Sequence, residues 1–365
     1  MAEIRVENLR KHFGDFAAVK DFNFTIADGS FFVMLGPSGC GKTTTLRMIA
    51  GLELPTGGRI LLDGEEVTLR RAAHRDIAFV FQLFALYPHM NVFRNIAFPL
   101  RCQGMARGEI RRRVEETARL LRIEHLLERR VGGLAGGDRQ RVALGRAIVR
   151  RPKAFLMDEP LGALDAEFRR LMCGELRQLH DRIHATTVYV THDQLEAMAM
   201  ADLIAVMNHG VVEQVGTPQE IYDRPDSMFV ADFIGSPPMS FLRFEWAVRR
   251  GDRTVRVNGA TVDVPELRED CAAGPLALGV RPEHVMIDAQ AALRGHVFGT
   301  EYLGTTQIVT LDTAHGQVRA RVPSSLDVRA GDNVGLKLRT ERLALFDARS
   351  GRALKSALYD GGAVG

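Results

Sequence analysis

Short apolar runs alternate with longer amphipathic segments over roughly the first 235 residues of the chain. Residues 31–35 (FFVML) form a continuous apolar run that ends in a glycine-rich turn, a pattern typical of a buried strand. The segment 42–50 that follows predicts a helix, which Gly51 is placed to end. Further apolar runs predict strands at 77–81, 155–157, 188–190 and 204–207. This alternation indicates an α/β fold with a largely parallel sheet.

Between residues 88 and 150 the apolar positions take the period of a helix. Ile110, Val114, Leu121 and Leu127 belong to a set of apolar positions at three-to-four-residue spacing, with Arg and Glu between them. We therefore expect a helical insertion, at about 88–150, within the α/β domain.

The pattern changes again after a segment rich in Gly, Pro and Ser, GSPPMS at 235–240, which is typical of a linker. Short strand-like runs separated by turn residues follow it, as expected of a small β-barrel or sandwich. These runs lie at 254–257, 276–280, 307–311, 318–322 and 334–338. The predicted domains are thus residues 1–235 and 236–365, the second being all-β.

Composition and charge narrow the class of protein. The 365 residues are 46% hydrophobic and 25% charged, as in ordinary globular proteins. The net charge is +3, and the basic residues occur as scattered pairs and one triplet, Arg111 to Arg113. A nucleic-acid-binding protein usually concentrates such charge in one stripe. We therefore interpret the basic residues as solvated helix faces and expect no nucleic-acid partner.

The cysteines and the first residues of the chain indicate the cellular compartment in which the protein works. Cys40, Cys102, Cys173 and Cys271 form no CxxC pair, which argues against a disulfide framework or a zinc site and favours a reducing cytoplasm. The chain starts MAEIRVENLRK, without the apolar region of a signal peptide. No stretch approaches the ~18 apolar residues of a membrane span. Any membrane role is therefore expected to come through a partner.

Residues 36–43, GPSGCGKT, match the phosphate-binding loop (P-loop) pattern GxxxxGK[ST] and stand between the predicted strand and the predicted helix. Glycines let the backbone point successive N–H groups at phosphate oxygens, and the helix N-terminus adds a positive partial charge. Lys42 supplies a cation, and the Thr43 hydroxyl is placed to ligate Mg²⁺. The candidate ATP-binding residues here are Gly36, Pro37, Ser38, Gly39, Cys40, Gly41, Lys42, Thr43 and Thr44.

A pair of acids ends the apolar run at 154–160, AFLMDEP. Asp158 at the end of this strand is the candidate second ligand of Mg²⁺. Glu159, one residue on, is the candidate general base that polarises the attacking water. Together with the P-loop, this pair predicts nucleotide hydrolysis.

The segment LAGGDRQRVALGRA at 134–147, the signature segment, resembles the LSGGQ motif and basic helix of the ATP-binding cassette (ABC) family. Four further residues resemble that family's elements in the same order along the chain. They are Phe13 (adenine stacking), Gln82 (Q-loop, metal), Asp165 of LGALD at 161–165 (D-loop) and His192 of YVTHDQ (switch histidine). The resemblance implies a P-loop NTPase of the ABC type that binds ATP with Mg²⁺ and hydrolyses it.

The resemblance also implies a homodimer in which each ATP lies between one copy's P-loop and the other copy's signature segment, at Ala135, Gly136, Gly137 and Asp138. His192 would contact the same phosphate, and Asp165 would lie at the dimer seam. This chain departs from the family pattern at Ala135 (usually Ser), Asp138 (usually Gln) and Gly162 (usually Ser). The departures are interpreted either as tolerated variation or as the mark of a slow composite site.

The C-terminal region resembles the regulatory TOBE-type OB-fold domain, through FIGSPPM at 233–239, GVRPEHV at 279–285, EYLG at 301–304 and RLALFDARSG at 342–351. ABC ATPases of sugar, polyol and glycerol-3-phosphate importers carry this domain. The segment QLFALYPHM at 82–90 resembles the one that receives the membrane subunits, and Phe84, Leu86 and Tyr87 are its candidate contacts. Packing of these three side chains in the core is the alternative.

The function expected from the resemblance is that of an ATPase subunit that powers an importer. It would work as a homodimer beneath two transmembrane permease subunits, peripherally on the cytoplasmic face of the bacterial inner membrane. A solute-binding protein outside the cytoplasm would deliver a sugar, polyol or glycerol-3-phosphate-like solute. Three alternatives stay open: an importer ATPase for polyamine, ferric iron, sulfate or molybdate, a soluble cassette ATPase outside transport, and a non-catalytic interaction module.

Overall fold

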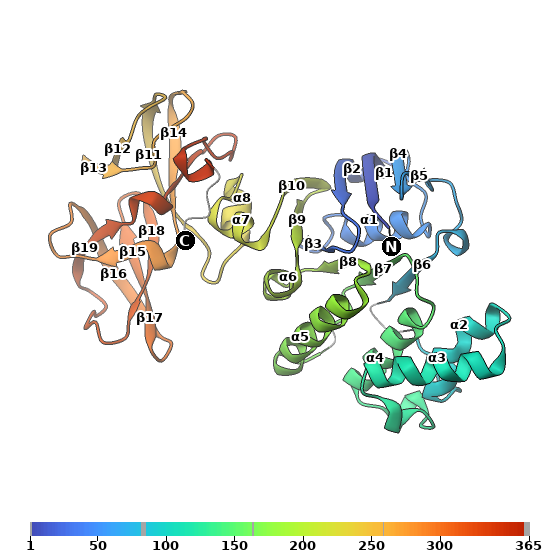
Figure 1. The fold of residues 1–365 in the computed structure, drawn as a ribbon. Helices are drawn as coiled ribbons and strands as arrows, with labels where there is room; N and C mark the ends of the chain where they lie inside the picture. Colours follow the sequence, from blue (N-terminus) through green and yellow to red (C-terminus); the bar gives the residue numbers. More distant parts are fainter. Residues whose placement is uncertain (1, 82–84, 163, 258, 361–365) are drawn as a thin grey trace. The chain divides into compact units, whose positions relative to one another are not determined.

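A computed structural model describes residues 2–81, 85–162, 164–257 and 259–360 of the chain (Figure 1). The chain forms two compact units, of which the first ends at Pro218 and the second begins at Gln219. Among the helices that the structure describes, none combines the length and the apolar character needed to cross a membrane.

The boundary between the units precedes the linker predicted at 235–240, because two short helices pack with the second unit. These helices are α7 (Pro218–Asp223) and α8 (Met228–Phe233). Ala231 of α8 is fully buried in an apolar cluster with Met239 of the predicted linker and with residues from beyond it, Ala277, Ala344, Phe346 and Ala353. Helix α8 therefore shares a core with the C-terminal strands.

The first unit is built around a six-stranded sheet of order β10-β9-β3-β8-β7-β6, parallel except for its edge strand β10. All side chains of β3, β7 and β8 are buried, as the continuous apolar runs predict. The strands are β3 (Phe31–Leu35), β6 (Ile77–Val80), β7 (Ala154–Asp158), β8 (Thr186–Thr191), β9 (Leu203–Asn208) and β10 (Val211–Gly216). The predicted parallel sheet is confirmed.

A second, antiparallel sheet of order β2-β1-β4-β5 shares one core with the parallel sheet and with helix α1 (Lys42–Ala50). Its strands were not predicted, since charged residues at their exposed positions dilute the apolar pattern. They are β1 (Ile4–Phe13), β2 (Phe16–Ile26), β4 (Gly57–Leu62) and β5 (Glu65–Glu66). Leu46 and Ile49 of α1 are fully buried between residues of both sheets, so this helix is held from two sides.

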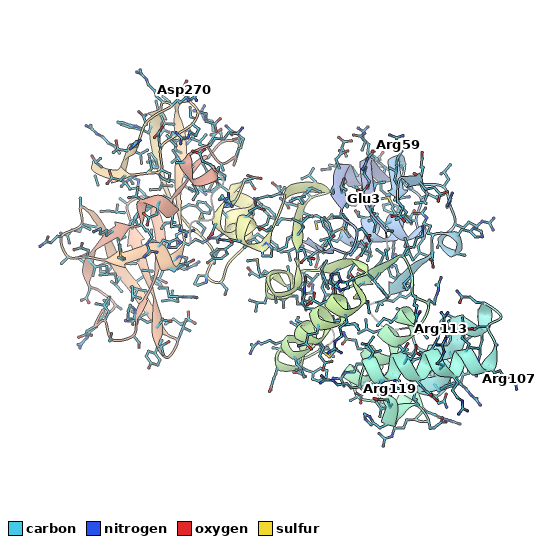
Figure 2. All side chains as sticks on the ribbon, in the orientation of Figure 1. Glu3, Arg59, Arg107, Arg113, Arg119 and Asp270 are labelled. Atoms are coloured by element: carbon cyan, nitrogen blue, oxygen red, sulfur yellow. The ribbon has the colours of Figure 1, made fainter. Side chains whose placement is uncertain are left out.

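The predicted helical insertion is confirmed by α2 (Val92–Cys102), α3 (Arg107–Leu120) and α4 (Gly136–Ile148), which pack on one another. Figure 1 shows them gathered on one side of the first unit, away from β1 and β2. In α3 the apolar positions Ile110 and Val114 are buried. Arg107, Arg113 and Arg119 are spread along the same helix (Figure 2), in keeping with dispersed basic charge.

Two more helices flank the parallel sheet. Helix α5 (Ala166–Ile183) lies between β7 and β8 in the sequence, and α6 (Gln194–Met200) follows β8 and contacts α5. Each begins at an aspartate whose carboxylate accepts a backbone N–H: Asp165 from Phe168 at 2.9 Å, and Asp193 from Leu195 at 2.8 Å. These caps fix the points where both helices start.

The second unit consists of antiparallel sheets, a five-stranded one of order β15-β19-β16-β17-β18, a three-stranded one of order β11-β14-β20 and the hairpin β12-β13. Its strands are β11 (Ser240–Val248), β12 (Thr254–Val257), β13 (Ala260–Asp263), β14 (Cys271–Val280), β15 (Val285–Ile287), β16 (Leu293–Tyr302), β17 (Thr306–Thr313), β18 (Gly316–Pro323), β19 (Asn333–Leu338) and β20 (Ala344–Asp347). The five strands predicted here are present, and one apolar cluster joins the sheets.

A buried arginine fastens α7 and α8 to this β-structure. Arg281, which follows β14, is 2% exposed, and burial lowers the pKa of its guanidinium. It donates to the backbone carbonyls of Tyr222 (2.8 Å), Ala231 (3.2 Å) and Ile234, and it stacks 4.1 Å from the centre of the Tyr222 ring. One side chain thus satisfies carbonyls at the ends of two helices.

Replacing this side chain should destabilise the second unit. Arg281→Met keeps an apolar stem but removes the side-chain donor of the Tyr222 and Ile234 carbonyls, at about 1–3 kcal/mol for each group that stays buried without a partner, whereas the Ala231 carbonyl still accepts the N–H of Met239. Trp246 on β11 is the only tryptophan of the chain, so its fluorescence during urea unfolding reports on this unit. The exposed Arg294→Met on β16 is the control and should unfold like the wild type. Equal midpoints for both variants would contradict the assigned role.

Candidate active site

The P-loop joins the buried strand β3 to helix α1 in the first unit. Gly41 is the N-cap of α1 and has a left-handed backbone with φ of 103°. A β-carbon at Gly41 would lie 2.5 Å from the carbonyl oxygen of Ala18 on β2. Both the conformation and the close approach therefore require glycine, and the loop is held against β2.

The ammonium group of Lys42 is folded back onto this loop. It donates to the carbonyl oxygens of Gly36 (2.7 Å) and Pro37 (2.9 Å), and the residue is 4% exposed. Cys40 Sγ lies 3.7 Å from the same nitrogen, and burial raises the pKa of its thiol. Lys42 is thus a buried cation whose charge is balanced by the dipoles of the two carbonyl groups.

The structure brings together two of the three predicted metal ligands, Thr43 and Asp158, which lie 115 residues apart in the sequence. Thr43 Oγ1 in the first turn of α1 donates to Asp158 Oδ1 at the end of β7, at 2.8 Å. Burial raises the pKa of Asp158, which is 8% exposed. A hydroxyl and a carboxylate side by side provide the hard oxygen donors that Mg²⁺ prefers. The residues present therefore fit this ion.

The next residue along, Glu159, faces His192 at the same edge of the sheet. Glu159 Oε2 lies 3.3 Å from His192 Nδ1, and the side chains are 20% and 55% exposed. Glu159 has a left-handed backbone with φ of 43°, and its N–H donates to the carbonyl of Val190 on β8 at 3.1 Å. The strained backbone turns the carboxylate out of the β7 strand direction and towards the end of β8.

The signature segment begins helix α4. Ala135 is its exposed N-cap and, having no side-chain oxygen, makes no capping hydrogen bond. Gly137 is buried and lies directly against the Phe168 ring, since a β-carbon there would come within 2.0 Å of an atom of that ring. Asp138 has a cationic neighbour, with Arg141 Nη1 at 3.5 Å, and Arg141 also donates three hydrogen bonds to Glu175. The negative charge expected at Asp138 is thus partly balanced.

The candidate adenine-stacking residue lies at the turn between β1 and β2. Phe13 is 49% exposed, pairs with Phe16 across the turn and carries the Lys11 ammonium 4.7 Å from its ring centre. A cavity of about 390 Å³ lies beside the P-loop, and Phe16 lines it, whereas Phe13 does not. Its lining is Asp15, Phe16, Ala17, Ala18, Lys20, Gly39, His209 and Gly210. Phe16 and His209 were not predicted as site residues.

The segment expected to meet membrane subunits is described only in part. Gln82 and Phe84 lie outside the described residues. Leu86 and Tyr87 are half-buried, and the Tyr87 ring lies 4.6 Å from that of Phe98 on α2. Arg146 on α4 donates to the carbonyl of Ala85 at 2.7 Å. The described part of this segment is therefore held against the helical insertion.

Three polar residues near His192 were missed from the sequence: Arg169 on α5, and Asp193 and Glu196 at the start of α6. Arg169 Nη1 donates to Asp193 Oδ2 at 3.1 Å, and its Nε lies 3.6 Å from Glu196 Oε1. Burial raises the pKa of Glu196. Asp193 could have been found as an N-cap, since it directly precedes a helical pattern. Arg169 could not have been identified from its sequence neighbours, because its acidic partners lie on another element.

Comparison with known proteins agrees with this geometry. Residues 19–162 match the ABC transporter family, and residues 278–346 match the TOBE domain. The trehalose import ATP-binding protein SugC of Mycobacterium tuberculosis is 45% identical, covering 97% of this chain and 98% of that protein. The sn-glycerol-3-phosphate import ATP-binding protein UgpC 3 of Rhizobium etli is 45% identical, covering 96% and 99%.

A solved structure matches the first part of the chain. The dimeric bacterial ABC transporter cassette MJ0796 has a TM-score of 0.53 and 31% identity, over 59% of this chain and 98% of that one. Relatives alike over nearly the full length of both chains settle the family. The chain belongs to the ABC transporter family, as one of its ATP-hydrolysing subunits with a C-terminal TOBE domain.

Proposed function

We propose that this chain powers the import of a sugar, polyol or glycerol-3-phosphate-like solute by hydrolysing ATP. The observation that carries the ATPase chemistry is the 3.3 Å approach of Glu159 and His192 beside the Thr43–Asp158 pair. The named relatives, import ATP-binding proteins for trehalose and for sn-glycerol-3-phosphate, support the solute class because they match over nearly their whole length. Polyamine, ferric iron, sulfate and molybdate are the rival solutes.

ATP binding starts at the P-loop in this proposal. The backbone N–H groups of residues 36–44 surround the phosphates, at the positive end of α1. Lys42 exchanges its bonds with the carbonyls of Gly36 and Pro37 for bonds to phosphate oxygens. Phe13 stacks on the adenine, and the cavity lined by Phe16 and His209 adjoins the same loop.

Thr43 and Asp158 hold Mg²⁺, and Gln82 is the further oxygen donor expected from the sequence. The ion, when bound, neutralises phosphate charge. Glu159 accepts a proton from the attacking water, whose oxygen forms the new bond to the γ-phosphorus as the bond from that phosphorus to the β–γ bridging oxygen breaks and ADP leaves. His192 is placed 3.3 Å from this base and contacts the phosphate from the same side. The two side chains thus orient and deprotonate the nucleophile.

Two copies of the chain complete each site. The signature segment of one copy, at Ala135, Gly136, Gly137 and Asp138, faces the phosphate held by the P-loop of the other. Asp165 lies at the seam between them. The dimeric form of the cassette MJ0796 supports this arrangement.

Transport requires membrane partners. The homodimer lies peripherally, on the cytoplasmic face of the inner membrane, beneath two permease subunits that the segment 82–90 contacts. A solute-binding protein on the other side of the membrane delivers the solute. Co-purification from native membranes, followed by identification of the permease and of the ligand of its binding protein, tests the solute class. A polyamine, metal or oxyanion ligand would overturn it.

The first prediction concerns the general base. Glu159→Gln should bind ATP normally but lose about 10²–10⁴-fold in turnover, because the amide cannot accept the proton. ATP should then hold the variant as a dimer in size-exclusion chromatography. The exposed Glu115→Gln on α3 is the matched control and should keep wild-type turnover. Hydrolysis by Glu159→Gln near the wild-type rate would refute the assignment.

A second prediction concerns the unusual signature segment. Ala135→Ser supplies a hydrogen bond to a charged acceptor, worth about 1.5–3 kcal/mol, and Asp138→Gln removes a negative charge near the phosphate. The double variant should therefore hydrolyse ATP faster or dimerise at lower ATP, by up to about tenfold for each ~1.4 kcal/mol. ATPase rate and dimer fraction are measured against ATP concentration.

The single variant Ala135→Ser separates the contribution of residue 135 to helix stability from its contribution to ATP binding. A serine N-cap should also stabilise α4 by about 0.5–2 kcal/mol without ATP, since Ala135 makes no capping bond. Urea unfolding of Ala135→Ser without ATP measures that contribution alone. ATP curves of the double variant that coincide with those of the wild type would mean that the departures are neutral.

Coupling to the membrane subunits is expected to depend on Tyr87. Tyr87→Ala removes the ring that packs on Phe98 and under Arg146. Transport in vesicles that contain the permease should fall severalfold, whereas ATP hydrolysis by the isolated subunit should be largely spared. Tyr87→Phe keeps the ring and should transport normally. Loss of both activities together would instead identify Tyr87 as a residue of the core.

A further inference from the structure

The first turn of α5 lies directly against the start of the signature segment. A β-carbon on Gly136 would lie 3.5 Å from the Leu164 side chain, and one on Gly137 would overlap the Phe168 ring at 2.0 Å. Leu164 directly precedes Asp165, the N-cap of α5, and Phe168 is in its first turn. The signature glycines therefore touch this turn without any intervening side chain.

The same turn is tied on its other side to the loop that carries His192. The Arg169 guanidinium donates through Nη2 to the carbonyl of Leu164 at 2.8 Å and through Nη1 to Asp193 Oδ2 at 3.1 Å. Asp193 directly follows His192 and caps α6 by accepting the N–H of Leu195. One planar side chain thus bridges the D-loop, at Leu164, and the residue next to the switch histidine.

One N–H group of Arg169 makes no hydrogen bond. It is the buried Nε–H, which has no acceptor within the part of the chain that the structure describes. Glu196 Oε1 is 3.6 Å away, too far for a hydrogen bond. Glu196 is 4% exposed and already accepts from Tyr189 at 2.7 Å and Thr191 at 2.8 Å. A shift of a few tenths of an ångström would give Arg169 this third bond, so the network has a second arrangement available.

We infer that Arg169 is a positioning residue that couples the signature segment to His192, so that ATP bound at one site of the dimer changes the alignment of the switch histidine at the other. The inference rests on the proposed function, in which the signature segment of one copy meets the ATP held by its partner. It goes beyond that function by assigning the link between the two sites to contacts of Arg169, Leu164 and Phe168.

Packing explains why a displacement would be transmitted rather than absorbed. Gly137 leaves no space between α4 and the Phe168 ring, and close-packed interiors do not compress. A displacement of the start of α4 therefore moves the first turn of α5. The guanidinium fork presents its donors in a fixed plane, so the carbonyl of Leu164 and the carboxylate of Asp193 move together.

The test measures ATP hydrolysis by the full-length chain against ATP concentration. The wild type should give a sigmoidal curve with a Hill coefficient above 1. Arg169→Met should lower the Hill coefficient to about 1 and the maximal rate by about 10- to 100-fold, as expected for a misplaced catalytic group. Arg169→Lys keeps the charge but cannot span both acceptors, so it should be intermediate. Arg170→Met, the same change at the next, exposed position, should match the wild type.

Two further variants approach the same contacts from either side. Asp193→Asn keeps an oxygen that can cap α6 but weakens the bond to Arg169, and Phe168→Ala opens space beside Gly137. Each should lower the Hill coefficient, and combining Arg169→Met with Asp193→Asn should add little to the worse single change. If Arg169→Met does not fold, as judged by its unfolding midpoint, these variants and Arg169→Lys decide the question.

The outcomes separate this inference from the proposed function. A wild type that does not hydrolyse ATP would refute the proposed function, and the inference with it. A wild type that hydrolyses ATP with a Hill coefficient of 1 would overturn the inference alone. So would an Arg169→Met variant that is slower but keeps the wild-type Hill coefficient, because the side chain would then only stabilise the site.

Discussion

The parallel pairing of β3, β8 and β7 as neighbours is the constraint on which the site depends. In this register Leu35 lies beside Thr191, and Asp158 lies beside Val190. The residues that follow the three strands therefore emerge at one edge of the sheet, where α/β proteins bind their ligands. The main-chain hydrogen bonds of the sheet thus bring the P-loop, His192 and the acidic pair to the same edge.

Burial then sets the electrostatics of that edge. Lys42 and Asp158 are both nearly inaccessible, and each is compensated by a short hydrogen bond, Lys42 to loop carbonyls and Asp158 to Thr43. Glu159 and His192, the proposed base and switch histidine, remain partly exposed. The groups proposed to bind are thus held in compensated contacts, whereas the groups proposed to react stay accessible.

Buried arginines perform related structural tasks in both units. Arg75, whose pKa burial lowers to about 10, donates to the carbonyls of Met48 and Ile49 at the end of α1. Arg281 does the same for the ends of α7 and α8 in the second unit. Arg169 differs from these two, because its acceptors belong to a helix start and to a neighbouring loop. Such a bridge joins two segments that are far apart in the sequence.

The sequence by itself determined the elements that are specified by residues close together in the chain. The strand at 31–35, the helix at 42–50, the P-loop and the acids at 158–159 follow from runs of apolar residues, glycine positions and caps within a few residues. Tertiary structure alone decided that Glu159 lies against His192, that α7 and α8 join the second unit, and that Arg169 bridges two loops. These contacts join distant segments, and their partners are selected by strand register and burial, which no local pattern specifies.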